Sequence, residues 1–443
     1  MVKNEKQSYE IMKNNNFKCN DNIFDIMILN YDNHRSLMKT TEVKFRHYLI
    51  TRILKPFIWV YFKIVYKLKY NIPKVHKEDG PFVVIGNHTV NPDPIIMGLS
   101  FRFHLYYIAS EQIFNLGFIS KVLKYLVNPI KKSKSVSDIV TIRKIKRITR
   151  ESGSIGIFPE GNTTYDGLTL SIPLSTAKLI KALKLPVIIL NTKGMYFTYP
   201  RWAVYRKKGK TEINLRTILK VEDYMDLTDE KLHQLLNEYL YVDAYKDQET
   251  KEVQFKGSHI AVGLERLIFM DLDRNIPFVT YTVGNKLKST VSDFELTYQT
   301  NGYVLTNKGE TKTLVELNCE VKLAYFNYYL NMPFQQLFVE NVEIIESFST
   351  KKISYGRFDI NLRKDSIYFI DQKGQTITWH FDHIVNIAIQ GKRQVIVYLE
   401  DATYLIKLNI PSSPYKYLLT YQYYNHIKLG GYHINEQLSE FGL

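Results

Sequence analysis

The chain has 443 residues, of which 59 are Lys or Arg and 44 are Asp or Glu, so its formal net charge is +15. Hydrophobic residues make up 45% of the sequence, which is enough for packed cores and excludes a disordered chain, and the length favours two to three domains. Two cysteines, Cys19 and Cys319, exclude a disulfide framework and a four-cysteine zinc site, and they fit a reducing compartment.

The basic excess is confined to the first half of the chain. Residues 1–220 contain 37 Lys and Arg against 15 Asp and Glu, a net charge of +22, and residues 221–443 contain 22 against 29, a net charge of −7. A basic region binds polyanions, so nucleic acid, an anionic membrane and phosphorylated ligands are all candidates. No signal peptide and no apolar run of the ~20 residues that span a bilayer is visible, which leaves a place on the membrane surface open.

Residues 1–44 form a polar segment that we expect to be poorly ordered or peripheral. Apolar residues recur at helical spacing from 47 to 70, where Lys and Arg interrupt them, and Pro56 should kink this helix or start a second one. The segment is either a buried helix pair that covers a sheet or an interfacial amphipathic anchor, and one face could serve each role.

Short apolar runs alternate with helical patterns from residue 81 onward. We predict strands at 81–87, 104–109, 154–158 and 186–190, a short extended run at 128–132, and helices at 94–100, 118–126, 136–150 and 173–183. This alternation predicts an α/β domain with a mostly parallel sheet over residues 45–220.

The pattern changes after residue 220. An acidic helix is predicted at 227–241, and residues 265–345 read as mostly β-like and irregular, so we expect a β-rich region over 221–343. Residues 344–443 contain short alternating runs at 357–362, 366–370, 376–381, 384–389, 394–399 and 404–408, followed by a helix at 414–428. Six or seven short strands and one final helix resemble a PH/GRAM-like barrel in layout.

Two motifs could carry chemistry. His88 follows an apolar strand, and a turn containing Pro92 could bring the carboxylate of Asp93 onto one imidazole nitrogen, which is the arrangement of a general base. On spacing alone, a strand-end histidine and a helix-capping aspartate remain the more common explanation. A second strand leads into Phe158-Pro159-Glu160-Gly161, followed by Asn162 and Thr163, a turn that could present N–H groups to an anion.

Together the two motifs resemble the glycerolipid acyltransferase family, best known for 1-acylglycerol-3-phosphate acyltransferases. That family carries Asn-His-x4-Asp, a basic middle motif, Phe-Pro-Glu-Gly and an apolar motif with proline. The matching positions here are His88 with Asp93, Lys131 with Lys132, 158–161 and 185–187, in that order, and 199–202 further resemble bacterial members. The resemblance covers about residues 50–220.

The resemblance implies that His88, held by Asp93, deprotonates a glycerol hydroxyl that then attacks an acyl thioester or acyl phosphate. It implies that Glu160 and Gly161, with Asn162 and Thr163 beside them, help to place the acceptor. Lys131 or Lys132 would bind its phosphate. Asn162-Thr163-Thr164 stands where many members carry an arginine, and Lys131-Lys132 stands where the middle motif usually ends in arginine, so the identity of the acceptor stays open.

A basic stretch and a set of possible metal-ligand positions each have a functional and a simpler structural explanation. Residues 131–150 contain eight basic residues and one acid, which is either a solvated helix face or a patch for anionic lipid headgroups. Asp271, Arg274, Ser289 and Ser292 stand where some bacterial relatives carry the paired cysteines of a zinc ribbon, so no metal is expected, and His380 with His383 is better explained as surface or strand histidines.

The sequence therefore predicts a peripheral protein on the cytoplasmic face of the membrane that transfers a fatty acyl group to a lysophospholipid, above all 1-acylglycerol-3-phosphate, and forms phosphatidate. We expect no cofactor beyond the acyl donor, which could be acyl-CoA, an acyl carrier protein or an acyl phosphate, and no nucleic-acid partner. The alternative is a non-catalytic lipid-binding protein on an acyltransferase scaffold.

Overall fold

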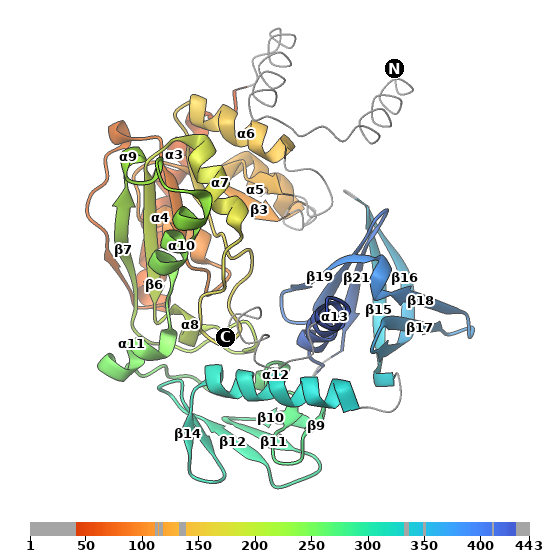
Figure 1. Cartoon of the computed structure of the whole chain (residues 1–443). Coiled ribbons are helices and arrows are strands. Elements are labelled where there is room, and N and C mark those ends of the chain that lie inside the picture. The colour runs from red at the N-terminus through yellow and green to blue at the C-terminus, as the bar shows by residue number, and fades with distance from the viewer. Residues whose placement is uncertain are drawn as a thin grey trace, which may run out of the picture. The chain divides into compact units, whose positions relative to one another are not determined.

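The computed structural model describes residues 41–110, 114, 118–132, 139–331, 336–348, 351–409 and 412–430. The described residues from Val43 onward belong to one compact unit (Figure 1). The predicted polar segment 1–44 therefore lies almost wholly outside the described residues, as do 136–138 at the start of the predicted basic helix.

The first part of this unit is an α/β region in which helices and strands alternate. Its elements are α3 (Phe45–Val65), β1 (Leu68–Asn71), β2 (Val83–Gly86), α4 (Asp93–Leu99), β3 (Leu105–Ser110), α5 (Phe118–Val127), β4 (Ile130–Lys132), α6 (Ile139–Arg150), β5 (Ser154–Ile157), α7 (Leu174–Leu183), β6 (Val187–Lys193), α8 (Met195–Thr198), β7 (Thr211–Leu219), α9 (Val221–Tyr224), α10 (Asp229–Leu240) and α11 (Ala244–Lys251).

The strands form one seven-stranded sheet with the order β1-β7-β6-β2-β5-β3-β4. The five strands from β6 to β4 are parallel, whereas β7 pairs antiparallel with β6 and carries β1 beside it. The prediction of a mostly parallel sheet is confirmed. The sequence patterns did not predict β1 or β7, because these partly exposed strands lack the continuous apolar runs of the central ones.

Both faces of the sheet are covered by helices. Val83 and Ile85 of β2 pack into a core with α6, α7 and α10, whereas Val84 between them packs into a second core with α3 and α4. This alternation is the two-residue period of a strand, and it fixes which residues of β2 leave the sheet at its carboxyl end. The loop after β2 therefore starts from a rigid, fully buried strand.

Helix α3 is one helix that runs through Pro56, so Pro56 does not start a second helix. His47 and Phe62 are buried on one side, but the helix exposes many large apolar side chains on another. Those that are at least one third exposed are Phe45, Leu49, Ile53, Leu54, Phe57, Trp59, Val60, Tyr61 and Ile64. None of the helices in the described ranges is long and apolar enough to cross a membrane.

The second part of the unit is a β-rich region closed by a long helix. It contains η3 (Leu264–Arg266), β8 (Met270–Asp271), β9 (Ile276–Pro277), β10 (Thr280–Val283), β11 (Lys286–Ser289), β12 (Glu295–Tyr298), β13 (Val304–Thr306), β14 (Thr311–Lys312) and α12 (Leu314–Asn331). The prediction that 265–345 is mostly β-like was wrong for α12. Its buried residues recur at the spacing of one helix face, but Val315, Ala324 and Leu330 are apolar and only partly buried or exposed, so the contrast between the two faces is weak. Figure 1 shows α12 running alongside the β10–β14 sheet.

The positions compared with a zinc ribbon are joined without a metal. One carboxylate oxygen of Asp271 accepts hydrogen bonds from the N–H groups of residues 273 and 274, and the other accepts one from Ser292 Oγ at 2.5 Å. Within the described part of the chain, no three His, Cys, Asp or Glu side chains could together hold a metal ion. A buried carboxylate thus links the two turns that paired cysteines would bridge in a ribbon.

The last part is a curled antiparallel sheet of seven strands followed by one helix. Its strands, β15 (Gln336–Phe348), β16 (Lys351–Arg363), β17 (Ser366–Asp371), β18 (Thr376–His380), β19 (Ile384–Gln390), β20 (Gln394–Leu399) and β21 (Thr403–Leu408), have the order β18-β17-β16-β15-β21-β20-β19, and α13 (Tyr415–Lys428) follows. The predicted strands and final helix are confirmed. No β18–β19 pair appears among the described strands, and β15 crosses the predicted boundary at 343/344.

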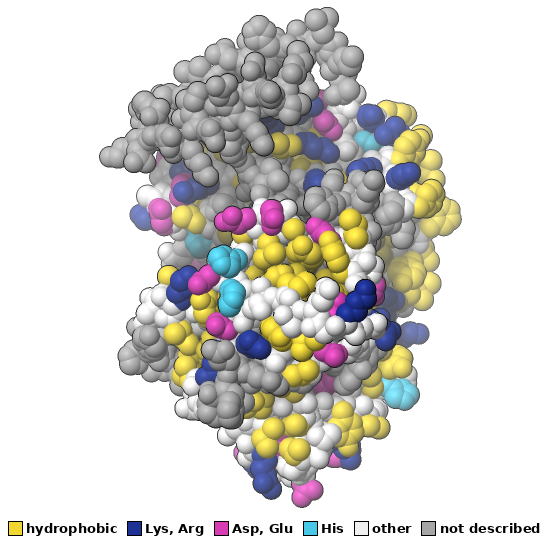
Figure 2. Space-filling view, turned by 90° about the vertical axis from the view of Figure 1, so that its right-hand side faces the viewer, with side chains coloured by type: hydrophobic (Ala, Val, Ile, Leu, Met, Phe, Trp, Pro, Cys, Tyr) yellow, Lys and Arg dark blue, Asp and Glu magenta, His cyan; other side chains and the backbone are white. Residues whose placement is uncertain are grey.

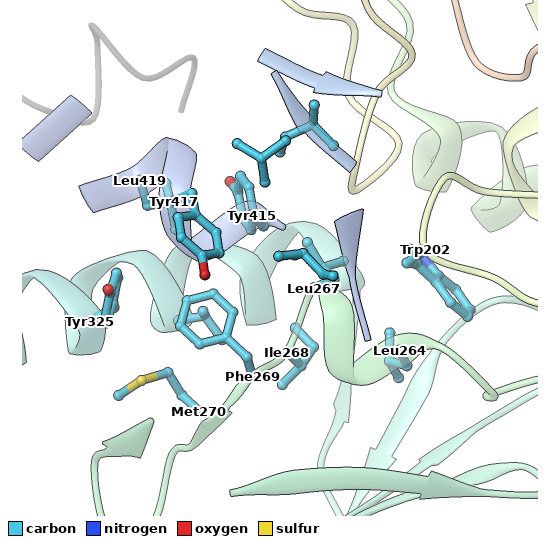
Figure 3. Close-up of a cluster of buried hydrophobic side chains, with 14 of the residues drawn as sticks. Trp202, Leu264, Leu267, Ile268, Phe269, Met270, Tyr325, Tyr415, Tyr417 and Leu419 are labelled. Atoms are coloured by element: carbon cyan, nitrogen blue, oxygen red, sulfur yellow. The ribbon is translucent and has the colours of Figure 1, made fainter. Parts of the chain in front are cut away.

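A single buried core joins the second and third parts and extends to residues 196–203 of the α/β region. Figure 3 shows Phe269 of this core near Tyr325 of α12 and Tyr415 of α13, and its ring stands edge-on to theirs at 5.1 and 6.5 Å. On the face shown in Figure 2, basic and acidic side chains are interspersed around hydrophobic patches.

Candidate active site

The site is built on two loops that leave adjacent parallel strands at the same edge of the sheet. The first loop follows β2 and carries His88, and the second follows β5, which pairs with β2, and begins at Phe158. Carboxyl ends of parallel strands are where open α/β sheets place their ligand sites. The Phe158 ring packs against the His88 imidazole with 4.6 Å between centroids.

His88 is oriented by Asp93, the first residue of α4. Its Nδ1 lies 3.0 Å from Asp93 Oδ2, and the same oxygen accepts the N–H groups of Thr89 at 2.6 Å and Val90 at 2.9 Å. The Asp93 side chain is fully buried, whereas the His88 side chain is 17% exposed. A carboxylate on Nδ1 selects the tautomer with a free Nε2 and stabilises the imidazolium once Nε2 takes a proton.

The start of this loop is fixed to the neighbouring strand. The buried amide of Asn87 accepts the N–H of Thr192 at 2.8 Å and donates to the Thr192 carbonyl at 3.3 Å. It thereby satisfies both backbone groups of a β6 residue. Asn87 is therefore a positioning residue, and its partner, 105 residues away, left no signal in the local sequence.

The side chain of Glu160 joins the two loops through hydrogen bonds. One oxygen accepts the N–H of His88 at 2.5 Å, and the other accepts the N–H of Leu170 at 2.8 Å. Burial raises the pKa of Glu160 from 4.5 to about 8, although these hydrogen bonds act in the opposite direction. Because each oxygen accepts a backbone N–H group, Glu160 ties the two loops together. Its expected role in placing the acceptor stays a prediction.

The turn after Glu160 also hydrogen-bonds to the histidine loop. Gly161 has φ of +70° and donates its N–H to the Phe158 carbonyl at 3.1 Å, which tightens the turn at a backbone angle that glycine adopts without strain. The N–H of Thr164 donates to the His88 carbonyl at 3.0 Å. Thr163 is buried and Asn162 is half-buried beside it.

Residues from the C-terminal parts hold this turn from the other side. Asp166 receives a hydrogen bond of 2.7 Å from Asn318 of α12, and the Tyr165 ring stacks on Tyr415 of α13 at 4.5 Å. Arg201 lies over the Tyr165 ring and donates to the Thr163 carbonyl at 3.4 Å. These partners are too distant in sequence for motif spacing to reveal them.

The two lysines of the middle motif lie farther along the same edge. Lys131 and Lys132 are exposed at the end of β4, which is separated from β2 by β5 and β3. Three strand spacings correspond to about 14 Å. The structure therefore brings His88, Asp93, Glu160 and the 161–163 turn together, and it sets the lysine pair apart from them along the sheet edge.

Comparison with known proteins identifies the α/β region. Residues 63–191 match the sequence model of the Acyltransferase family. The chain is 29% identical over 140 residues to a 1-acyl-sn-glycerol-3-phosphate acyltransferase of Borreliella burgdorferi, a match that covers 30% of this chain and 54% of that protein. The chain thus spans about half the length of this curated relative. Over these residues the chain is similar to glycerolipid acyltransferases.

Two solved structures overlap with parts of the chain at low similarity. The 1-acyl-sn-glycerophosphate acyltransferase of Thermotoga maritima is 21% identical, with a TM-score of 0.38 over 52% of this chain and 89% of its own. The N-terminal PH domain of human ARAP2 is 11% identical, with a TM-score of 0.17 over 20% of this chain and 81% of its own. TM-scores this low carry no argument about fold or function.

Proposed function

We propose that this protein is an O-acyltransferase that transfers a fatty acyl group to a hydroxyl of a lysophospholipid. We infer that 1-acylglycerol-3-phosphate is the principal acceptor and phosphatidate the product, because the similar stretch of the Borreliella protein belongs to an enzyme named for that acceptor. The observation that carries the proposal is the 3.0 Å contact between His88 Nδ1 and the buried Asp93 carboxylate.

The reaction needs a base and no nucleophile from the protein. His88 Nε2 takes the proton of the acceptor hydroxyl while its oxygen attacks the acyl carbonyl carbon, and Asp93 stabilises the resulting imidazolium. The tetrahedral intermediate then expels a thiolate or a phosphate, and the imidazolium returns its proton to that leaving group. An acyl thioester on coenzyme A or on an acyl carrier protein and an acyl phosphate all satisfy this scheme, which requires no further cofactor.

The acceptor phosphate would lie along the edge of the sheet. The turn 161–163 adjoins His88, and Lys131 and Lys132 stand about 14 Å away by strand count. Lysine binds phosphate as a point charge at the end of a flexible stem, so it can reach inward from β4.

We also propose that the protein is peripheral on the cytoplasmic face of the membrane and that α3 contacts the lipid. Phe45, Leu49, Ile53, Phe57 and Ile64 recur every three to four residues or at multiples of that spacing, and each is exposed by 43% or more. Such a stripe is unfavourable in water and stable in the boundary between headgroups and acyl chains. Seven antiparallel strands followed by α13 further support a PH/GRAM-like arrangement of the last region.

A panel of acyl donors and acceptors tests the activity. The purified full chain is incubated with lysophosphatidate, other lysophospholipids or glycerol 3-phosphate, each with acyl-CoA, acyl carrier protein thioester or acyl phosphate, and the lipid products are identified by mass spectrometry. We expect phosphatidate from at least one donor with lysophosphatidate. No turnover with any pair, together with retained binding to vesicles, would instead support the non-catalytic lipid-binding alternative.

A further inference from the structure

Four basic side chains gather where the segment 199–207 meets η3 and the turn between β19 and β20. This basic cluster consists of Arg206, Lys207, Arg266 and Lys392. Burial, together with the charges of Arg266 and Arg206, lowers the pKa of Lys392 to about 8. Burial, together with the charge of Lys392, lowers the pKa of Lys207 to about 7. Arg206 and Lys392 also lie over the same Tyr199 ring, at 5.6 and 3.7 Å from its centre, so Lys392 is close to the other three groups.

Neutral groups are the partners of these cations. Lys207 Nζ lies between the rings of Trp202, at 4.6 Å, and Tyr298, at 4.8 Å. Lys392 Nζ lies 3.7 Å from the centre of the Tyr199 ring and donates to the carbonyl of residue 203. Rings and carbonyls favour a cation but leave its net charge uncompensated.

No carboxylate of the described residues pairs with the cluster. The charge of Glu265 partly offsets the burial that lowers the pKa of Arg266, but its Oε2 accepts hydrogen bonds from Thr282 Oγ1 at 2.5 Å and from the N–H of Gly263 at 3.2 Å rather than from a cluster side chain. Two buried donor atoms of the cluster, Lys207 Nζ and Arg266 Nε, have no hydrogen-bond partner. An unpaired buried cation costs several kcal/mol, and several together are stabilised best by an anion that offers many acceptor oxygens, such as a phosphate.

The cluster adjoins the apolar side of α3. The Arg206 guanidinium is exposed and donates to the Tyr61 hydroxyl at 3.1 Å, while it lies 4.9 Å over the Tyr66 ring. Tyr61 stands on α3 between Phe57 and Ile64, which are 73% and 69% exposed. Positive charge therefore lies directly beside a surface suited to acyl chains. A phospholipid joins a negatively charged phosphate to acyl chains, so it could contact both.

We propose that the basic cluster binds the phosphate of an anionic phospholipid in the bilayer on which α3 lies. Arg206 and Lys392 supply the accessible donors, and Lys207 and Arg266 supply positive charge from behind them. This site is formed by residues other than the acyl-transfer dyad. It rests on the proposed contact between α3 and the membrane and is independent of acyl transfer.

Vesicle binding tests the proposal on the full-length protein. Partition onto phosphatidylcholine vesicles, with and without phosphatidylglycerol, is measured by cosedimentation for wild type and for Arg206→Ala/Lys392→Ala. The control is Lys208→Ala/Lys210→Ala, which removes the same charge from two exposed residues that follow the segment 199–207. Lys392→Gln, which keeps a donor for the carbonyl of residue 203, serves if the double variant does not fold.

The cluster variant should lose about 100-fold in partition onto anionic vesicles, since each charge-assisted hydrogen bond is worth about tenfold, and it should keep its binding to neutral ones. The control variant should lose about tenfold in the same partition, which is a tenth of the loss expected for the cluster variant. Equal losses in both variants would overturn the site. A second result would also overturn the proposal. If vesicle binding is unchanged in the cluster variant, and inorganic phosphate raises the melting temperature of wild type but not of that variant, the ligand of the cluster is a free phosphate and not a lipid.

Two further variants separate this site from the rest of the account. Phe57→Ser/Ile64→Ser should weaken binding to neutral and anionic vesicles alike, because it removes apolar contacts. No effect of that variant would contradict the membrane contact of α3 and with it the lipid assignment. His88→Ala should keep the preference for anionic vesicles whatever it does to acyl transfer.

Discussion

Substituting Asp93 by Asn separates the charge of this residue from its role in the fold. The Asn amide oxygen can keep the hydrogen bonds from the N–H groups of Thr89 and Val90, at 2.6 and 2.9 Å in the wild type. The amide nitrogen would replace Oδ1, which has no partner in the structure. We therefore expect the variant to fold, with a loss of stability of about 1–2 kcal/mol.

The effect on catalysis should be much larger. A carboxylate 3.0 Å from the imidazolium contributes about 5.5 kcal/mol at an effective dielectric constant of ~20. This corresponds to roughly 10⁴-fold in rate at about 1.4 kcal/mol for each factor of ten. The Asp93 side chain is fully buried behind His88, so it cannot contact the acceptor. The loss should therefore appear in kcat and leave KM for the acceptor nearly unchanged.

The assay is steady-state acyl transfer to lysophosphatidate by purified wild type and Asp93→Asn, with melting temperatures recorded for both. A folded variant whose kcat falls by less than about tenfold would show that the Asp93 charge does not support a developing imidazolium. A variant that fails through KM alone would move Asp93 from catalysis to acceptor binding.

Three further outcomes follow from the contacts around the site. Between pH 4.5 and about 8, Glu160 is protonated in the folded chain and ionised in the unfolded chain, so the free energy of unfolding should fall as pH rises through this window. Urea titrations across the window should show a smaller fall for Glu160→Gln. Asn318→Ala removes the 2.7 Å hydrogen bond to buried Asp166; acyl transfer should drop while vesicle binding stays, and an unchanged rate would deny α12 any influence on the turn. Burial raises the pKa of Asp271, but hydrogen bonds from Ser292 and its neighbours lower it more, to below 3.8; Asp271→Ala should destabilise the protein by about 1–3 kcal/mol at neutral pH, and by less as pH falls below 4, in thermal melts at both pH values.

The pattern of apolar residues predicted those strands and helices whose buried positions are either continuous or regularly spaced along the sequence. The strands of the parallel sheet are continuous apolar runs, and those of the last region alternate regularly, so both were found with small errors at their ends. Helix α12 was missed because apolar residues such as Val315, Ala324 and Leu330 also occur outside its buried positions, which weakens the contrast between its two faces. Strands β1 and β7 were missed because partly exposed strands resemble loops in composition.

The candidate site divides in the same way. The contact between His88 and Asp93 spans five residues, so a turn of fixed length makes it predictable from spacing. Glu160 was found as a motif residue, but its partners, the N–H groups of His88 and Leu170, are set by how two loops meet in space. Asn318 lies 152 residues from Asp166, and no property of a single sequence records such a pairing.

Replacing His88 by alanine tests the central claim most directly. His76 is the matched control, because its side chain is 56% exposed in the described structure and lies outside both motif loops. With lysophosphatidate and the preferred donor, His88→Ala should lower kcat by about 10²–10⁴-fold, the usual contribution of a general base, while its melting temperature and that of His76→Ala stay near wild type. A folded His88→Ala protein that transfers acyl groups at the rate of His76→Ala would contradict the account.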